Sequence, residues 1–149
     1  IPAESADREA YDAHRIALGI PDAGRDYELA DAFPHEALYD QLGSVEFKKG
    51  CFIGQEVVSR MQHRGTARKR TVRVRLSEPV EPGTEVKAGE ATIGTIGSAG
   101  PATAIALLRL DRAGEAKAAG TPLTAGSATV EIDLPEWLHL DPATGKAHA

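Results

Sequence analysis

The stretch Arg70-Thr71-Val72-Arg73-Val74-Arg75-Leu76 decides the fold of the second half of the chain. Apolar side chains at every second position, with polar ones between them, predict a strand that is buried on one face. Further short strands are expected at 91–97, 104–108, 122–124 and 130–134, with glycine and proline between several of them. Short strands joined by such turns are typical of a small β-barrel or β-sandwich.

Before residue 70 the pattern is mainly helical. Residues 5–18 are expected to form a helix capped by Ser5, and residues 55–63 a second one. A short helix over 34–42 and a brief strand over 45–47 are expected between them. The chain is therefore divided into an α+β segment over 1–69, a β domain over 70–139 and a frayed tail over 140–149.

The composition limits the class of protein. With 149 residues, 42% of them hydrophobic and 26% charged, the chain is long enough to bury a sizeable core. No apolar run approaches the roughly 18 to 20 residues of a membrane span, and the first residues lack the pattern of a secretory signal. We therefore expect a cytoplasmic protein without a membrane segment. Because the chain starts at Ile1, a further N-terminal portion is also expected.

The charge is unevenly distributed along the chain. The net charge is -5, yet residues 48–75 contain nine Lys and Arg residues and a single acid, Glu56, which gives this segment +8 and the remainder -13. This segregation favours an anion-binding site, and a solvated basic face is the alternative. The same segment has one aromatic residue, Phe52, so direct binding of nucleic acid is not expected.

Cys51 is the only cysteine, which excludes an internal disulfide and a thiolate cluster within one copy of the chain. It comes just before the helix predicted over 55–63, and two lysines precede it. Helix dipole and cations both favour a thiolate, so a reactive thiol is predicted here; a small buried side chain is the alternative. The five histidines show no metal-ligand spacing, and no metal site is expected.

The segment Lys49-Gly50-Cys51-Phe52-Ile53-Gly54-Gln55-Glu56, followed by Arg64-Gly65 and Arg70, resembles the signature of the YgfZ-type folate-binding proteins. These are relatives of the glycine-cleavage T protein and of mitochondrial iron-sulfur maturation factors. The resemblance extends from about Tyr11 to Trp137. It implies the C-terminal part of a three-domain ring: the end of the α+β middle domain, which carries the motif, and a six-stranded antiparallel β-barrel.

The resemblance also implies a function. Such proteins bind tetrahydrofolate or a derivative and support the assembly or repair of iron-sulfur clusters in client enzymes, including enzymes that thiolate tRNA. Cys51 is then the expected functional thiol. The expected folate-binding residues are Tyr11, Lys49, Gln55, Arg60 and Arg64.

One position departs from the pattern. Where the T protein and some YgfZ relatives have a glutamate that clasps the pterin ring, this chain has Ala17, so weaker or altered folate recognition is expected. The alternative function is folate-dependent one-carbon transfer of the aminomethyltransferase kind. It ranks second because T proteins generally lack the cysteine motif.

Overall fold

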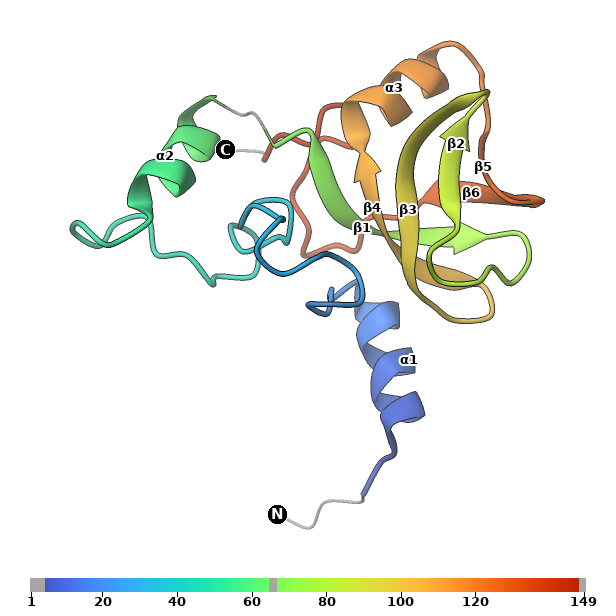
Figure 1. The fold of residues 1–149 in the computed structure, drawn as a ribbon, viewed down its shortest axis with the longest axis horizontal. Coiled ribbons are helices and arrows are strands. Elements are labelled where there is room, and N and C mark those ends of the chain that lie inside the picture. Colours follow the sequence, from blue (N-terminus) through green and yellow to red (C-terminus); the bar gives the residue numbers. More distant parts are fainter. Residues whose placement is uncertain (1–4, 65–66, 148–149) are drawn as a thin grey trace.

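The computed structural model describes residues 5–64, of Arg64 only the backbone, and residues 67–147. A β-barrel forms the larger body (Figure 1). Helix α1 (Arg8–Leu18) projects away from it, and α2 (Gln55–Arg64) lies beside it, near the end of the chain. The segment between the two helices consists mainly of turns.

Within the described residues, six strands close into one barrel in the order β1-β4-β3-β2-β5-β6, and every neighbouring pair is antiparallel. This confirms the expected six-stranded antiparallel barrel with helical segments around it. The strands are β1 (Lys69–Leu76), β2 (Glu85–Ala88), β3 (Ala91–Ala99), β4 (Thr103–Arg109), β5 (Leu123–Ala125) and β6 (Ala128–Ile132).

Strand β1 joins β4 to β6 and supplies part of the core. Val72 and Val74 are fully buried, as their alternation with arginines predicts. Val74 pairs with Ala104 of β4, a strand whose residues 104–106 are all fully buried. Each fully buried valine contributes about 1.5–3 kcal/mol relative to an exposed one.

Two glycines of β3 allow the chain to approach very closely. A Cβ atom on Gly94 would lie 2.1 Å from the carbonyl oxygen of Leu107 in the neighbouring strand. A Cβ atom on Gly97 would lie 2.4 Å from Oδ1 of Asp26, in the segment after α1. Gly97 therefore lets that segment lie directly on the barrel.

A buried polar network holds the C-terminal end of α1 against the barrel. The guanidinium of Arg15, which is 3% exposed, donates to the Asp26 carboxylate at 2.8 Å and to the Ser98 hydroxyl of β3. Asp26 also accepts the backbone N–H of Ser98. The indole N–H of Trp137 donates to the carbonyl of Leu18 at 2.8 Å, which fixes the end of α1 as well.

The start of α1 differs from the expectation. The helix begins at Arg8, and Asp7 rather than Ser5 is its cap, because the Asp7 carboxylate accepts the backbone N–H of Ala10 at 2.8 Å. At the other end, Gly19 has a positive φ of 76° and ends the helix.

The helix expected over 34–42 is absent, and so is the strand expected over 45–47; turns and bends are found at both places. Leu38 explains the first difference. Its φ of 63° interrupts helical geometry, and its side chain is fully buried in the core. Packing of this one side chain therefore outweighs local helix propensity.

After β4, a third helix and an ordered tail pack on the barrel. Helix α3 (Leu110–Ala118) buries Leu110, Ala113 and Ala116 against the barrel. The described part of the tail is not frayed, since Leu140 is 3% exposed and forms a β-bridge with Ala147.

Candidate functional site

The cysteine motif forms the turn that leads into α2. The backbone N–H of Gln55 donates to the carbonyl of Phe52 at 3.2 Å, and the Phe52 N–H donates to the Gln55 side-chain oxygen at 3.0 Å. Gly54 has a φ of 89°, which favours glycine at this position. Gln55 thus closes the turn with its backbone and its side chain together.

An open cavity of about 830 Å³ lies between this turn and α2. Its wall combines aromatic, cationic and polar side chains. The Lys49 ammonium lies 4.4 Å from the centroid of the Phe52 ring, which is a cation–π contact. Further lining residues are Phe47, Gln55, Glu56, Ser59, Arg60 and His63.

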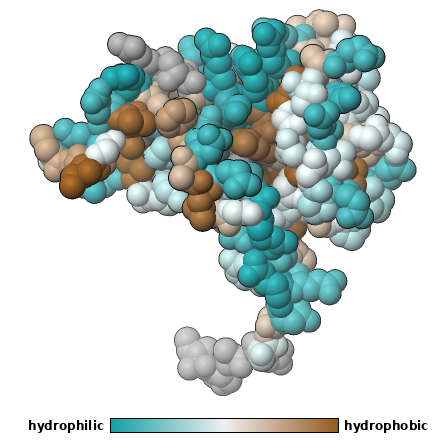
Figure 2. All heavy atoms as spheres, viewed as in Figure 1, coloured by the Kyte–Doolittle hydropathy of each residue, from teal (hydrophilic) through white to brown (hydrophobic). Residues whose placement is uncertain are grey.

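Cys51 lies in the same turn, next to Phe52, and is exposed. Because the side chain is exposed, the alternative of a small buried side chain is wrong. In the described part of the chain the thiol has no hydrogen-bond partner. The neighbouring surface is apolar: Ile53 is fully exposed, and Phe47 and Val57 are 44% and 45% exposed. Figure 2 shows apolar surface in the region of the turn and α2.

The structure brings together three of the predicted folate-binding residues, because Lys49, Gln55 and Arg60 line the same cavity. Tyr11 is not among them. It is 55% exposed on α1, in contact with Arg8, and α1 and α2 lie apart in Figure 1. The side chain of Arg64 lies outside the described residues.

Much of the positive charge of residues 48–75 is neutralised in the fold. Four of its nine cations form ion pairs with carboxylates. Three of these lie in β1: two face acids in or just after β6, and the third, which is buried, faces the segment before the motif. The anion site predicted from charge alone therefore reduces, near the cavity, mainly to Lys49. The pairs are Arg60–Glu56, Arg70–Asp40, Arg73–Asp133 and Arg75–Glu131.

Several residues that shape the site have no signal in the sequence. Phe47 and His63 line the cavity, and His35 is 2% exposed behind α2, with its Nε2 3.0 Å from the Gln62 side-chain oxygen. His35 and Phe47 contact each other through their rings. No spacing in the sequence indicates these contacts, because turns without a repeating period bring the residues together.

No metal-ligand cluster and no membrane-spanning helix is found within residues 5–64 and 67–147. No group of three or more His, Cys, Asp or Glu side chains there is arranged to hold a metal ion. None of the helices in these ranges combines the length and the apolar character needed to cross a membrane.

Comparison with known proteins identifies the barrel. Residues 68–140 match the family of the CAF17 C-terminal beta-barrel domain. A mitochondrial iron-sulfur cluster assembly factor IBA57 homologue of Cryptococcus neoformans is 44% identical over 66 residues, which cover 44% of this chain and 18% of the relative. The human mitochondrial iron-sulfur cluster assembly factor IBA57 is 40% identical over 70 residues, which cover 47% of this chain and 20% of the relative.

A third relative has the same description. The mitochondrial IBA57 homologue of Coccidioides immitis is 35% identical over 82 residues, which cover 55% of this chain and 19% of the relative. The chain thus spans only about a fifth of the length of these three relatives.

These relatives are mitochondrial proteins, which contradicts the expectation of a cytoplasmic location. The expected location was based partly on the first residues of the given sequence. The chain spans only about a fifth of these relatives, so those residues do not indicate where the whole protein is located. The expected resemblance is confirmed over these segments: residues 68–140 match the CAF17 C-terminal beta-barrel domain, and relatives described as IBA57 are similar to about half of the chain.

Proposed function

We propose that this chain belongs to a protein that supports iron-sulfur cluster assembly, with Cys51 as the thiol that contacts the cluster or its components. The observation that carries the proposal is an exposed cysteine in a glycine-flanked turn beside a cavity. The relatives named as iron-sulfur cluster assembly factors support the same class of function.

A single thiolate cannot hold a cluster, because such clusters need about four protein or thiol ligands. The remaining ligands must come from a partner, either a client iron-sulfur protein or a small thiol. The exposure of Cys51 is compatible with such shared ligation. Exposed Ile53, Val57 and Phe47 supply apolar area beside the thiol for a client protein, such as a tRNA-thiolating enzyme.

Cluster formation in vitro tests the thiol. The full-length protein is incubated anaerobically with ferrous and ferric iron, sulfide and glutathione, and cluster formation is followed by visible absorption. We expect the wild-type protein to acquire the charge-transfer bands and Cys51→Ser to lose them. Ser59→Cys, made in the Cys51→Ser background, tests whether the position of the thiol matters. Ser59 lines the cavity from α2, whereas Cys51 lies in the turn. Equal absorption in wild type and Cys51→Ser would overturn the thiol role.

Folate binding is a separate proposal, and the described residues suit only part of the ligand. Lys49 and Arg60 line the cavity and could pair with the carboxylates of a tetrahydrofolate tail. The two positions considered for contact with the pterin half do not line this cavity. Tyr11 is exposed on another helix, and Ala17 offers only a methyl group. We therefore propose tail binding at the cavity, with the pterin held by groups outside the described residues.

Calorimetric titration of the full-length protein with tetrahydrofolate tests this arrangement. Lys49→Ala should weaken binding by about tenfold, the cost of losing one charge-assisted hydrogen bond. Lys87→Ala, on the barrel, should leave binding unchanged. Tyr11→Ala should also leave it unchanged, and a large loss there would show that the pterin stacks on α1.

A further inference from the structure

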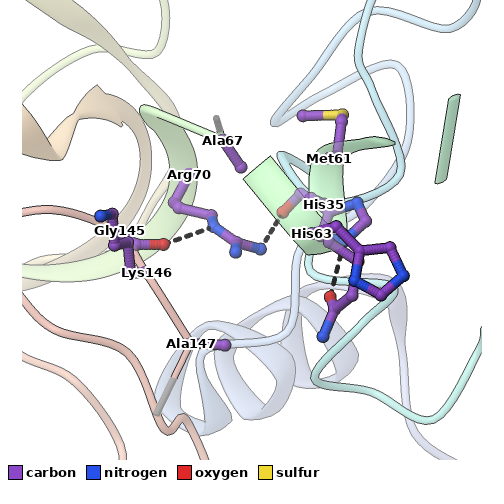
Figure 3. Close-up of a pocket in the computed structure, with 9 residues that line it drawn as sticks. His35, Met61, His63, Ala67, Arg70, Gly145, Lys146 and Ala147 are labelled. Atoms are coloured by element: carbon purple, nitrogen blue, oxygen red, sulfur yellow. Dashed lines mark hydrogen bonds between the residues drawn. The ribbon is translucent and has the colours of Figure 1, made fainter. Parts of the chain in front are cut away.

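A second cavity, of about 270 Å³, lies between the end of α2 and the barrel (Figure 3). Arg70 of β1 and Gly145 of the tail lie on one side of it, and His35 and His63 on the other. The predicted function makes no use of this cavity. It is formed by side chains from four separate parts of the sequence.

Arg70 is a cation held in a fixed position at this cavity. It is 2% exposed, its Nε donates to the Gly145 carbonyl at 3.1 Å, and its Nη1 donates to Asp40 at 2.7 Å and to the His35 carbonyl. Its other terminal nitrogen, Nη2, has no hydrogen-bond partner in the described ranges. Nη2 is not among the fully buried unpaired atoms there, and Arg70 lines the cavity.

His35 adds a second unfilled hydrogen-bonding group. Its side chain is 2% exposed, and its Nε2 is engaged with Gln62 at 3.0 Å. Its Nδ1 is buried and has no partner among the residues that the structure describes. Two nearly fully buried side chains at one cavity therefore have unused polar atoms, which is costly unless another group satisfies them.

The chemistry of the wall selects an anion over a cation. A guanidinium edge matches the planar or tetrahedral oxygens of carboxylate and phosphate. Asp40 already balances the charge of Arg70, but the exposed Lys146 adds a positive charge to the lining. A metal ion would face the same guanidinium and ammonium groups and is repelled by them.

We propose that this cavity binds the oxyanion group, carboxylate or phosphate, of a small molecule. The Nη2 atom of Arg70 is the anchor, and Lys146 and His63 are the cation and the donor at the rim. Gln62 and His63 line this cavity and the motif cavity alike, so the two cavities share the last turn of α2. The inference does not depend on the proposed function, because it uses none of the motif side chains.

Titration of the full-length protein with inorganic phosphate, and separately with acetate, tests the site by calorimetry and by the imidazole NMR signals of His35 and His63. Saturable binding of one anion is expected, and the tighter one identifies the source of the oxyanion. Lys146→Ala and His63→Ala should each weaken binding by about three- to tenfold. Lys117→Ala, an exposed lysine on α3, is the matched control and should bind like wild type.

Arg70→Lys keeps the charge and removes the guanidinium edge, so it should weaken binding more than either rim variant. Circular dichroism establishes whether this variant is folded, and the two rim variants keep the test decisive if it is not. No saturable binding of either anion would overturn the proposal. So would wild-type affinity in both rim variants, or an equal loss in Lys117→Ala.

Discussion

The barrel and the motif turn treat apolar side chains in opposite ways. In the barrel, Val72, Val74 and Leu108 are fully buried. In the turn and the first part of α2, Ile53 is fully exposed and Val57 is 45% exposed. The barrel uses its apolar groups for stability, whereas the turn presents them on the surface together with a thiol. Exposed apolar side chains gathered beside a reactive group are typical of a binding surface.

Ion pairs in the two regions are expected to contribute very different amounts to the free energy of unfolding. Asp26→Ala removes the most deeply buried of the carboxylates that pair with Arg15 next to the barrel, and should cost about 3–5 kcal/mol of the free energy of unfolding. Glu56→Ala removes the partner of exposed Arg60 on α2, and should cost less than about 1 kcal/mol. Urea unfolding of the two variants measures both values, and equal costs would contradict the account.

Core and surface leucine-sized side chains give the next largest contrast. Leu108→Ala removes a fully buried side chain of β4 and should cost about 2–5 kcal/mol, since it leaves a cavity. Ile53→Ala, at a fully exposed position, should change the free energy of unfolding by no more than about 0.5 kcal/mol. A large destabilisation by Ile53→Ala would mean that the turn is part of the folding core.

Substitutions at two glycines compare a closely packed position of the barrel with an open position of the motif turn. Gly97→Ala places a Cβ against Asp26 and should cost about 1–3 kcal/mol. Gly50→Ala meets no atom within 4 Å and has an ordinary φ, so stability should be unchanged. Chemical denaturation of both proteins distinguishes them, and a neutral Gly97→Ala would show that this contact is looser than described.

The smallest expected effect concerns acid stability. The hydrogen bond from Arg25, helped by Arg15 and Arg8 and opposed by burial, holds the pKa of Asp12 well below its usual value of 3.8. A carboxyl with a lowered folded pKa stabilises the protein above its unfolded pKa, and this contribution is lost as the pH falls toward the folded pKa. The Tm advantage of wild type over Asp12→Asn should therefore be constant near neutral pH and shrink below about pH 4. An advantage that grows at low pH would contradict this assignment.

The barrel could be predicted from the sequence because its signals are local and repeated. The alternation in β1 and the apolar run of β4 each determine a strand without reference to distant residues. Strand β2 was missed because Glu85–Ala88 is too short to show a period. The division of the chain at residues 69, 70 and 139 stays a prediction.

The site was only partly predictable. The motif correctly indicated Lys49 and Cys51 as members of one turn, since only Gly50 separates them in the sequence. The position of Tyr11 depends on how α1 leaves the barrel, which the Arg15 and Asp26 network determines through contacts distant in sequence. The conformation of Leu38 is likewise decided by burial, and the buried Arg70 and His35 acquire their roles only when the tail and α2 meet.

Rescue of an iron-sulfur enzyme in cells that lack the gene tests the central claim most directly, because it asks whether the exposed turn carries the function. Full-length protein with Cys51→Ser should fail to restore the enzyme's activity, although its free energy of unfolding equals that of wild type. Full restoration by Cys51→Ser would contradict the account.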